Sequence, residues 1–237
     1  MEKRMNKTVT NIIQWLVILA MPFFLGLGSI QLIIAAAPAY LTYEYNKPDF
    51  PPDPYGFTTQ HREELAIVAV RYLQRREPAE EVIFLLEEQQ LPDGSGPLYN
   101  ASEIGHMLDV KNVTDAVGRI WLVAAVIVVG GLVVLLFRPD TRPAGYRAIL
   151  GGGIATTVVL LFIALFILLA WNVFFVQFHE LLFPPETWTF RFDESLIRLF
   201  PEKFWFDIGV IMSMLPLLAG ILTAILGYIL VRRGNGE

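Results

Sequence analysis

A lone histidine follows the third long apolar run of this 237-residue sequence. His179 lies between Phe178 and Glu180, and Pro184-Pro185 ends the segment a few residues later. An imidazole at such a polar–apolar boundary can exchange a proton near neutral pH while it faces a substrate held in a membrane. This segment is therefore the first candidate for chemistry, with His179 as its acid–base group.

A second histidine, His106, lies between two carboxylates at helical spacing. Glu103 and Asp109 are each three residues from it, so the three side chains share one face of a predicted helix. Asp109 would then orient the imidazole, although a solvated helix face explains the same spacing. Ser102 lies one turn before His106 and is a conceivable nucleophile, but no second group nearby would activate it.

Three further residues, all later in the sequence than His179, are candidates for supporting roles. Trp188 is either a substrate contact or part of the belt that tryptophans form at membrane interfaces. Arg198 and Glu202 are four residues apart, so they either support the site or pair with each other across one helical turn.

Four apolar runs are long enough to cross a bilayer, which requires about 20 residues. The predicted spans are residues 12–39, 120–137, 149–171 and 208–231. None has a charged residue or a histidine in its interior, which disfavours ion or proton transport through the bundle. The predicted fold class is an all-α membrane protein with four transmembrane helices and an extracytoplasmic, mainly helical cap.

The distribution of basic residues predicts the orientation. Lys and Arg cluster in residues 1–11, 138–148 and 232–237, and the positive-inside rule places these three segments in the cytoplasm. The long segments 40–119 and 172–207 then lie outside and carry both candidate histidines. Most acidic residues fall in these two segments, so the net charge of −5 is largely external, and no basic groove for nucleic acid is visible.

Within the first outer segment the pattern predicts two helices. The first, about Thr59–Arg76, has apolar residues at helical spacing. The second, about Ser102–Gly118, is expected to run into the second span. A proline-rich stretch at residues 48–54 holds the backbone away from helix, while Glu81–Leu86 fits either a short strand or a helical turn.

Metal chemistry finds little support in the sequence. His179-Glu180 begins like the zinc-protease motif H-E-x-x-H, but Phe183 occupies the position of the second histidine. His61, His106 and His179 would supply three ligands, yet nothing in their spacing favours a shared site. The chain has no cysteine, so it offers no thiolate ligand or nucleophile. No metal site is predicted.

Two segments together resemble a known family. Gly105–Val110, which reads G-H-M-L-D-V, resembles the first signature of the lipoprotein intramolecular transacylases, which are small bacterial membrane proteins. Phe178–Phe183, with Trp188 and the later Leu199–Glu202, resembles the second signature. The resemblance covers most of the chain, with four spans, a long first outer segment and two outer motifs in order.

The resemblance implies an acyl transfer within one lipoprotein molecule. The sn-2 acyl chain of a diacylglyceryl-modified cysteine would move to the α-amino group of that cysteine, which gives an N-acyl lyso-form lipoprotein. It also implies that His106 and His179 are essential, that diacylated lipoproteins in a bacterial cell membrane are the substrates, and that membrane lipids surround the site. No cofactor is required.

The sequence does not show which of the two histidines, His106 or His179, is the base. It also leaves the oligomeric state open. A different class of protein also fits the sequence, namely a non-enzymatic four-span membrane protein whose extracytoplasmic cap binds a partner or lipid. Such a binding protein would tolerate the loss of either imidazole.

Overall fold

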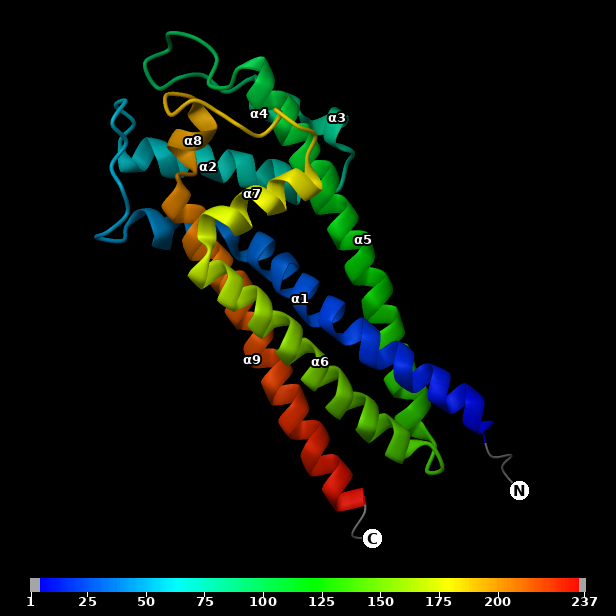
Figure 1. The fold of residues 1–237 in the computed structure, drawn as a ribbon. Coiled ribbons are helices and arrows are strands. Elements are labelled where there is room, and N and C mark those ends of the chain that lie inside the picture. Colours follow the sequence, from blue (N-terminus) through cyan, green and yellow to red (C-terminus); the bar gives the residue numbers. More distant parts are fainter. Residues whose placement is uncertain (1–4, 235–237) are drawn as a thin grey trace. The chain divides into compact units, whose positions relative to one another are not determined.

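The computed structural model describes residues 5–234, which form an almost entirely helical protein (Figure 1). Residues 1–4 and 235–237, which belong to the predicted cytoplasmic ends, lie outside the described residues. In chain order the helices are α1 Lys7–Tyr45, α2 Thr59–Gln74, α3 Ala79–Val82, α4 Phe84–Glu87, α5 Ala101–Phe137, α6 Arg142–Leu169, α7 Trp171–Leu182, α8 Ser195–Leu199 and α9 Glu202–Gly234. Residues 5–234 contain no strand, only an isolated bridge between Gln90 and Pro97. The predicted all-α class is confirmed.

Four helices of the described chain, α1, α5, α6 and α9, are long and apolar enough to cross a membrane. Helix α5 begins at Ala101, so the helix expected at residues 102–118 and the second apolar run are one continuous helix. Helix α6 begins at Arg142, within the predicted 138–148 link, and ends at Leu169. The ambiguous Glu81–Leu86 stretch is helical and is divided between α3 and α4.

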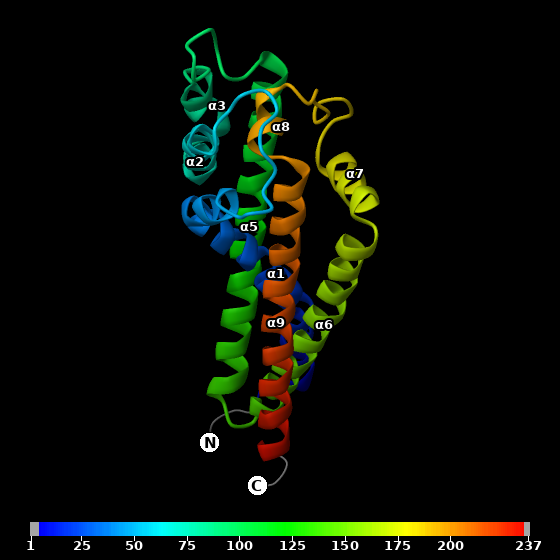
Figure 2. The same cartoon turned by 90° about the vertical axis from the view of Figure 1, so that its left-hand side faces the viewer.

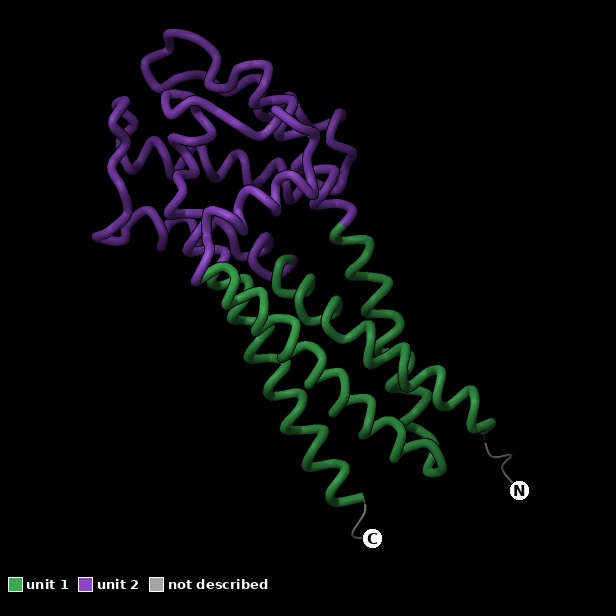
Figure 3. The backbone as a smooth tube through the Cα atoms, in the orientation of Figure 1, with its two compact units in different colours: residues 1–30, 117–168, 210–237 green, residues 31–116, 169–209 purple. Residues whose placement is uncertain are grey.

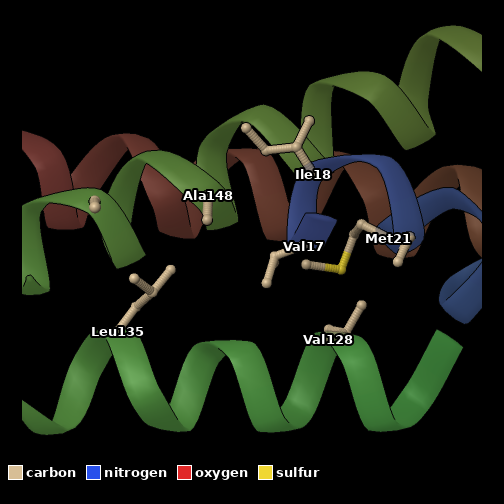
Figure 4. Packing of buried hydrophobic residues seen from close by; sticks show 8 residues of the cluster. Val17, Ile18, Met21, Val128, Leu135 and Ala148 are labelled. Carbon is tan, nitrogen blue, oxygen red and sulfur yellow. The ribbon is translucent and has the colours of Figure 1, made fainter. Parts of the chain in front are cut away.

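The chain divides into two compact units (Figure 3). The first consists of residues 1–30, 117–168 and 210–237. Within it, segments of α1, α5, α6 and α9 run side by side (Figure 2). Its buried cluster comes from three of these helices and comprises Val17, Ile18, Ala20 and Met21 of α1, Val128 and Leu135 of α5, and Ala144 and Ala148 of α6 (Figure 4).

Glycines allow α6 and α9 to pack closely against each other in this first unit. A Cβ added to Gly153 would collide with the backbone of Ala224, and one added to Gly227 would collide with the backbone of Leu150. Lipid tails are as apolar as leucine side chains, so transmembrane helices associate through close van der Waals packing, which small residues permit. The two preceding glycines, Gly151 and Gly152, face the side chains of Ile18 and Met21 in α1 at similarly short range, so helix packing explains the three consecutive glycines.

The second unit consists of residues 31–116 and 169–209. Buried tyrosines connect its helices through main-chain carbonyls. The hydroxyl of Tyr45 in α1 donates to the Leu199 carbonyl of α8 at 2.7 Å, and the hydroxyl of Tyr72 in α2 donates to the Met107 carbonyl of α5 at 3.2 Å. Because a buried hydroxyl needs a partner, these bonds fix α1 to α8 and α2 to α5.

Helix α2 corresponds to the amphipathic helix predicted at residues 59–76, and side chains satisfy both of its ends. At the start, the Thr58 hydroxyl accepts a hydrogen bond from the His61 N–H at 3.1 Å. At the end, the fully buried Lys111 of α5 donates to the Arg75 carbonyl at 2.9 Å and to both carboxylate oxygens of Asp115 at 3.0 Å. A cation at a helix C-terminus stabilises the last carbonyls, so Lys111 also joins α2 to α5.

Candidate functional site

His106 lies in the second turn of α5, whose start is fixed by a reciprocal capping box. The Asn100 side chain accepts hydrogen bonds from the N–H groups of Ser102 and Glu103 at 2.8 and 3.0 Å. In return, Glu103 Oε2 accepts from the Asn100 N–H at 2.8 Å. This exchange satisfies three main-chain donors at the helix start, and it determines where His106 leaves the helix.

Glu103 uses its second oxygen to hold another helix. Its Oε1 accepts a hydrogen bond from the Leu196 N–H, at the start of α8, at 2.7 Å, and the residue is only 1% exposed. Both carboxylate oxygens are therefore occupied by main-chain donors. The role that this geometry supports for Glu103 is to position α5 and α8.

His179 lies in the last turns of α7 and is bonded to its own helix. Its Nδ1 is 2.7 Å from the main-chain carbonyl oxygen of Phe175. A carbonyl can only accept, so Nδ1 carries the hydrogen and Nε2 carries the lone pair in the neutral ring. Burial lowers the pKa of His179 below its ordinary value, and the bond to Phe175 opposes part of that shift. The structure thus presents a neutral imidazole whose basic nitrogen is Nε2.

One phenylalanine brings the two histidines into the same site. The ring of Phe183 lies 4.9 Å from the ring of His106 and 5.6 Å from the ring of His179, measured between centroids. Phe183 is buried, and its N–H donates to the His179 carbonyl at 2.9 Å, which ends α7. Residues from two distant segments of the sequence therefore meet at Phe183.

Further aromatic rings surround the pair. The ring of Phe190 is 5.3 Å from that of His106, and the ring of Trp188 is 4.9 Å from that of His179 at an interplanar angle of 35°. The sequence left two roles open for Trp188, a place in an interfacial belt or a contact with substrate. In the structure Trp188 packs on His179 itself. An aromatic face also favours a nearby cation, so Trp188 would stabilise the ring of His179 in its protonated form.

Sequence reasoning did not identify the roles of Phe175 and Phe183. Phe175 precedes His179 by four residues, and this spacing alone predicts a shared helix face. The capping box had a visible signal too, because Asn-x-x-Glu at residues 100–103 is a helix-start pattern.

Asp109 is not bonded to the ring of His106. No hydrogen bond joins the two residues within the described chain, and His106 Nδ1 is buried without a hydrogen-bond partner there. His61 lies in α2, outside the group of rings around Phe183. Direct orientation of His106 by Asp109 therefore has no support in this geometry.

Arg198 and Glu202 do not pair with each other. Arg198 Nε and Nη2 donate to the two carboxylate oxygens of Asp53 at 3.3 and 3.0 Å, and these side chains are 10% and 1% exposed. Glu202 instead accepts from Trp171 Nε1 at 3.0 Å. Helix α8 ends at Leu199 and Phe200 leaves helical conformation, so residues 198 and 202 do not share a helical turn.

The partner of Arg198 explains the proline-rich stretch at residues 48–54. Burial alone would raise the pKa of Asp53, but the hydrogen bonds from Arg198 and the Phe57 N–H bring it below its ordinary value. Arg62 holds the same stretch by donating to the Pro51 carbonyl at 2.7 Å. The buried Arg62 and the largely buried Arg198 thus fix this loop to α2 and α8.

The aromatic side chains around His106 and His179 offer few metal ligands. Among residues 5–234, no group of three or more His, Asp or Glu side chains is placed to hold a metal ion.

Together, the four apolar helices and the paired histidines define a class, a multi-pass helical membrane protein with an imidazole-based candidate site. The sequence model of the lipoprotein intramolecular transacylase Lit family matches residues 15–205, and the chain belongs to this family of acyltransferases. An uncharacterised protein of Aquifex aeolicus is 27% identical over 220 residues, which cover 92% of this chain and 94% of that protein.

Solved structures show the same fold. The membrane-integral lipoprotein intramolecular transacylase Lit of Bacillus cereus aligns with a TM-score of 0.77 at 21% identity, covering 98% of this chain and 100% of that one. A histidine-to-alanine variant of that protein aligns with a TM-score of 0.70 at 21% identity, covering 97% of each chain.

Proposed function

We propose that this protein transfers the sn-2 acyl chain of a lipoprotein's diacylglyceryl-cysteine to the α-amino group of the same cysteine. The observation that carries the proposal is the contact of Phe183 with both His106 and His179. An α-amino group has a pKa of about 7.7–8.0 and is largely protonated at neutral pH, whereas attack on an ester requires the neutral amine. A neutral imidazole beside the reacting amine meets this need.

His179 is the base in this mechanism, acting through Nε2. The amine nitrogen attacks the ester carbonyl carbon, and His179 takes a proton from that nitrogen. The carbon–oxygen bond at the sn-2 position then breaks, and the imidazolium returns the proton to the departing alkoxide. The products are an amide and a free sn-2 hydroxyl, so atoms and charge balance without a cofactor.

His106 stabilises the oxyanion in the same mechanism. Its N–H is directed at the oxygen of the tetrahedral intermediate, where a donor that is already in place lowers the barrier most. The rings of Phe183, Phe190 and Trp188 present apolar surface to the two imidazoles, which disfavours water at the ester and so the competing hydrolysis. Because donor and acceptor sit on one substrate, holding them in contact is a second source of rate.

The orientation of the protein forms part of the proposal. The first and last segments and the 138–148 link are cytoplasmic, while segments 40–119 and 172–207, with both histidines, are extracytoplasmic. Reporter tags inserted near Gly94 and Glu194 should then be accessible from outside, and tags at either chain end should not. A cytoplasmic tag at Gly94 would place the histidines on the wrong side of the membrane for lipoproteins.

Mass spectrometry of a lipoprotein's N-terminal peptide tests the chemistry. With the wild-type protein, an acyl group should appear on the amine while the total number of fatty acids stays unchanged. His106→Ala and His179→Ala should each abolish this migration while the protein still accumulates in the membrane. His61→Ala is the matched control, because it removes a histidine outside the site. Normal turnover by both site variants would favour the binding-protein interpretation.

A further inference from the structure

A row of aromatic rings runs along α7 away from His179. Phe175 lies four residues before His179, with ring centroids 4.1 Å apart, and Trp171 lies four residues before Phe175 at 5.4 Å. Residues four apart share a helix face, so Trp171, Phe175 and His179 form one stripe, called here the aromatic row. At 1.5 Å per residue it extends about 12 Å along the helix. The ring of Phe206 meets Trp171 edge-on at 5.3 Å and marks the far end.

Protein side chains do not fully cover this row. No residue of α7 is buried, and the three members of the row are half-buried. Their polar atoms are already bonded, since Trp171 Nε1 donates to Glu202 and His179 Nδ1 donates to the Phe175 carbonyl. The exception is His179 Nε2, which makes no hydrogen bond within residues 5–234. The row therefore offers a long apolar surface with one basic nitrogen at its end.

We propose that the aromatic row binds the acyl chain that migrates, with the ester next to His179 and the hydrocarbon running toward Trp171. The proposal rests on the acyl transfer proposed above and adds a substrate subsite to it. A straight hydrocarbon chain needs apolar surface along its length and chemistry at one end, which is the arrangement that α7 presents. A peptide segment in the same place would leave its backbone polar groups without partners, at a considerable cost in free energy.

The row predicts a dependence on acyl-chain length. A hexadecanoyl chain whose ester lies next to His179 reaches past Phe175 to Trp171, whereas a hexanoyl chain ends before Trp171. Removing the Trp171 ring should therefore weaken the reaction of long chains and spare that of short ones. A ring that served only to hold α7 in place, or only to contact bulk lipid, would affect both substrates equally.

The experiment compares two synthetic diacylglyceryl lipopeptides that differ only in the sn-2 chain, hexadecanoyl or hexanoyl. Trp171→Ala should lower kcat/KM for the hexadecanoyl substrate about tenfold and change it less than about twofold for the hexanoyl substrate, because only the long chain loses hydrocarbon contacts. Trp171→Phe should retain most of the length preference. Leu181→Ala is the control on the same helix, since Leu181 is 81% exposed and outside the row. Equal losses for both substrates, or no loss for either, would overturn the proposal.

A second readout does not depend on turnover. A lipopeptide with a photoreactive diazirine midway along the sn-2 chain is irradiated with the wild-type protein, and the cross-linked peptide is identified by mass spectrometry. Cross-links to Trp171, Phe175 or Phe206 support the row as the chain site, and cross-links confined to other helices overturn it. Cross-linking to the row without acyl transfer would contradict the proposed reaction while leaving the acyl subsite in place.

Discussion

The Nδ1–H of His179 is bonded to the main-chain carbonyl of Phe175, one helical turn earlier, at 2.7 Å. This bond selects a single neutral tautomer of the ring, because a carbonyl oxygen has no hydrogen to donate in return. A backbone acceptor here has the role that a carboxylate has in many histidine-dependent sites, where it also orients the ring. The site therefore needs no acidic residue beside His179.

The pH dependence of turnover follows from the state of this ring. Burial holds the pKa of His179 below the ordinary value of about 6.5, so the ring stays neutral down to a pH below about 6.5. In the proposed mechanism it therefore remains available as the base at that pH. Deprotonation of the substrate amine should raise kcat a second time near pH 8. We expect kcat to have its lower inflection below pH 6.5, measured with a synthetic lipopeptide.

The lowered pKa of His179 also makes the stability of the fold depend on pH. The unfolded chain binds this proton more tightly than the folded chain, so the contribution of His179 to the free energy of unfolding is lost as pH falls below about 6.5. An inflection that ring-labelled NMR assigns to His179 at pH 7 or above would contradict the neutral-base role.

Replacing Phe183 should separate catalysis from folding. Phe183→Leu keeps a buried apolar side chain but removes the flat ring that touches His106 and His179. A misplacement of the two imidazoles by about 1 Å should lower kcat by about 10- to 100-fold. The free energy of unfolding should fall by less than about 1.5 kcal/mol. Phe84→Leu, at an exposed phenylalanine of α4, is the matched control, and full turnover by Phe183→Leu would show that its ring is dispensable.

Breaking the ion pair between Asp53 and Arg198 should destabilise the second unit. Asp53→Asn leaves a buried guanidinium without its counter-charge, which costs about 3–5 kcal/mol in buried pairs. Thermal unfolding in detergent measures the loss. The double variant Asp53→Leu/Arg198→Met should be more stable than either single change, because it removes both charges together. Additive losses would indicate that the two side chains act independently.

Two glycines of the membrane helices should respond oppositely to the same substitution. A Cβ at Gly153 meets the backbone of Ala224, whereas one at Gly130 meets nothing within 4 Å. Gly153→Ala should therefore force α6 and α9 apart and lower the thermal midpoint. Gly130→Ala should be neutral or stabilising by up to about 1 kcal/mol, from helix propensity alone. Similar midpoints for the two variants would disprove the close approach of α6 and α9.

No acyl-enzyme should form during the reaction. The chain has no cysteine, and Ser102, an exposed residue, lies at the capped start of α5. Ser102→Ala should keep wild-type turnover, and a lipopeptide with an acetylated α-amino group should bind without reacting. Intact-protein mass spectrometry during turnover provides the check, since a mass increase of one acyl group would indicate a covalent intermediate.

Local patterns predicted much of this fold because the elements involved depend on neighbouring residues. Apolar runs identified the four long helices, and helical periodicity located α2 to within two residues at its end. Both histidines were singled out from short segments around them, yet their contact through Phe183 joins α5 to α7 across more than 70 residues.

Other features depended on contacts that no local pattern contains. Arg198 pairs with Asp53, which lies 145 residues away in the sequence, and not with Glu202, which lies four away. This is because α8 ends at Leu199 and the loop brings Asp53 within reach of Arg198. The hydrogen bond of Glu103 to Leu196 spans 93 residues in the same way. Tertiary packing decides these partners, and helical spacing alone does not indicate them.

The short span between Phe175 and Phe183 limits how α7 can change in length. His179 bonds backward to the Phe175 carbonyl and its own carbonyl accepts the Phe183 N–H, so two successive helical turns share one residue. A single inserted residue between Phe175 and His179 would rotate the imidazole by about 100° around the helix axis. The imidazole would then leave the helix face that it shares with Phe175 and Trp171. Insertions and deletions in this stretch should therefore be far less tolerated than substitutions on its outer face.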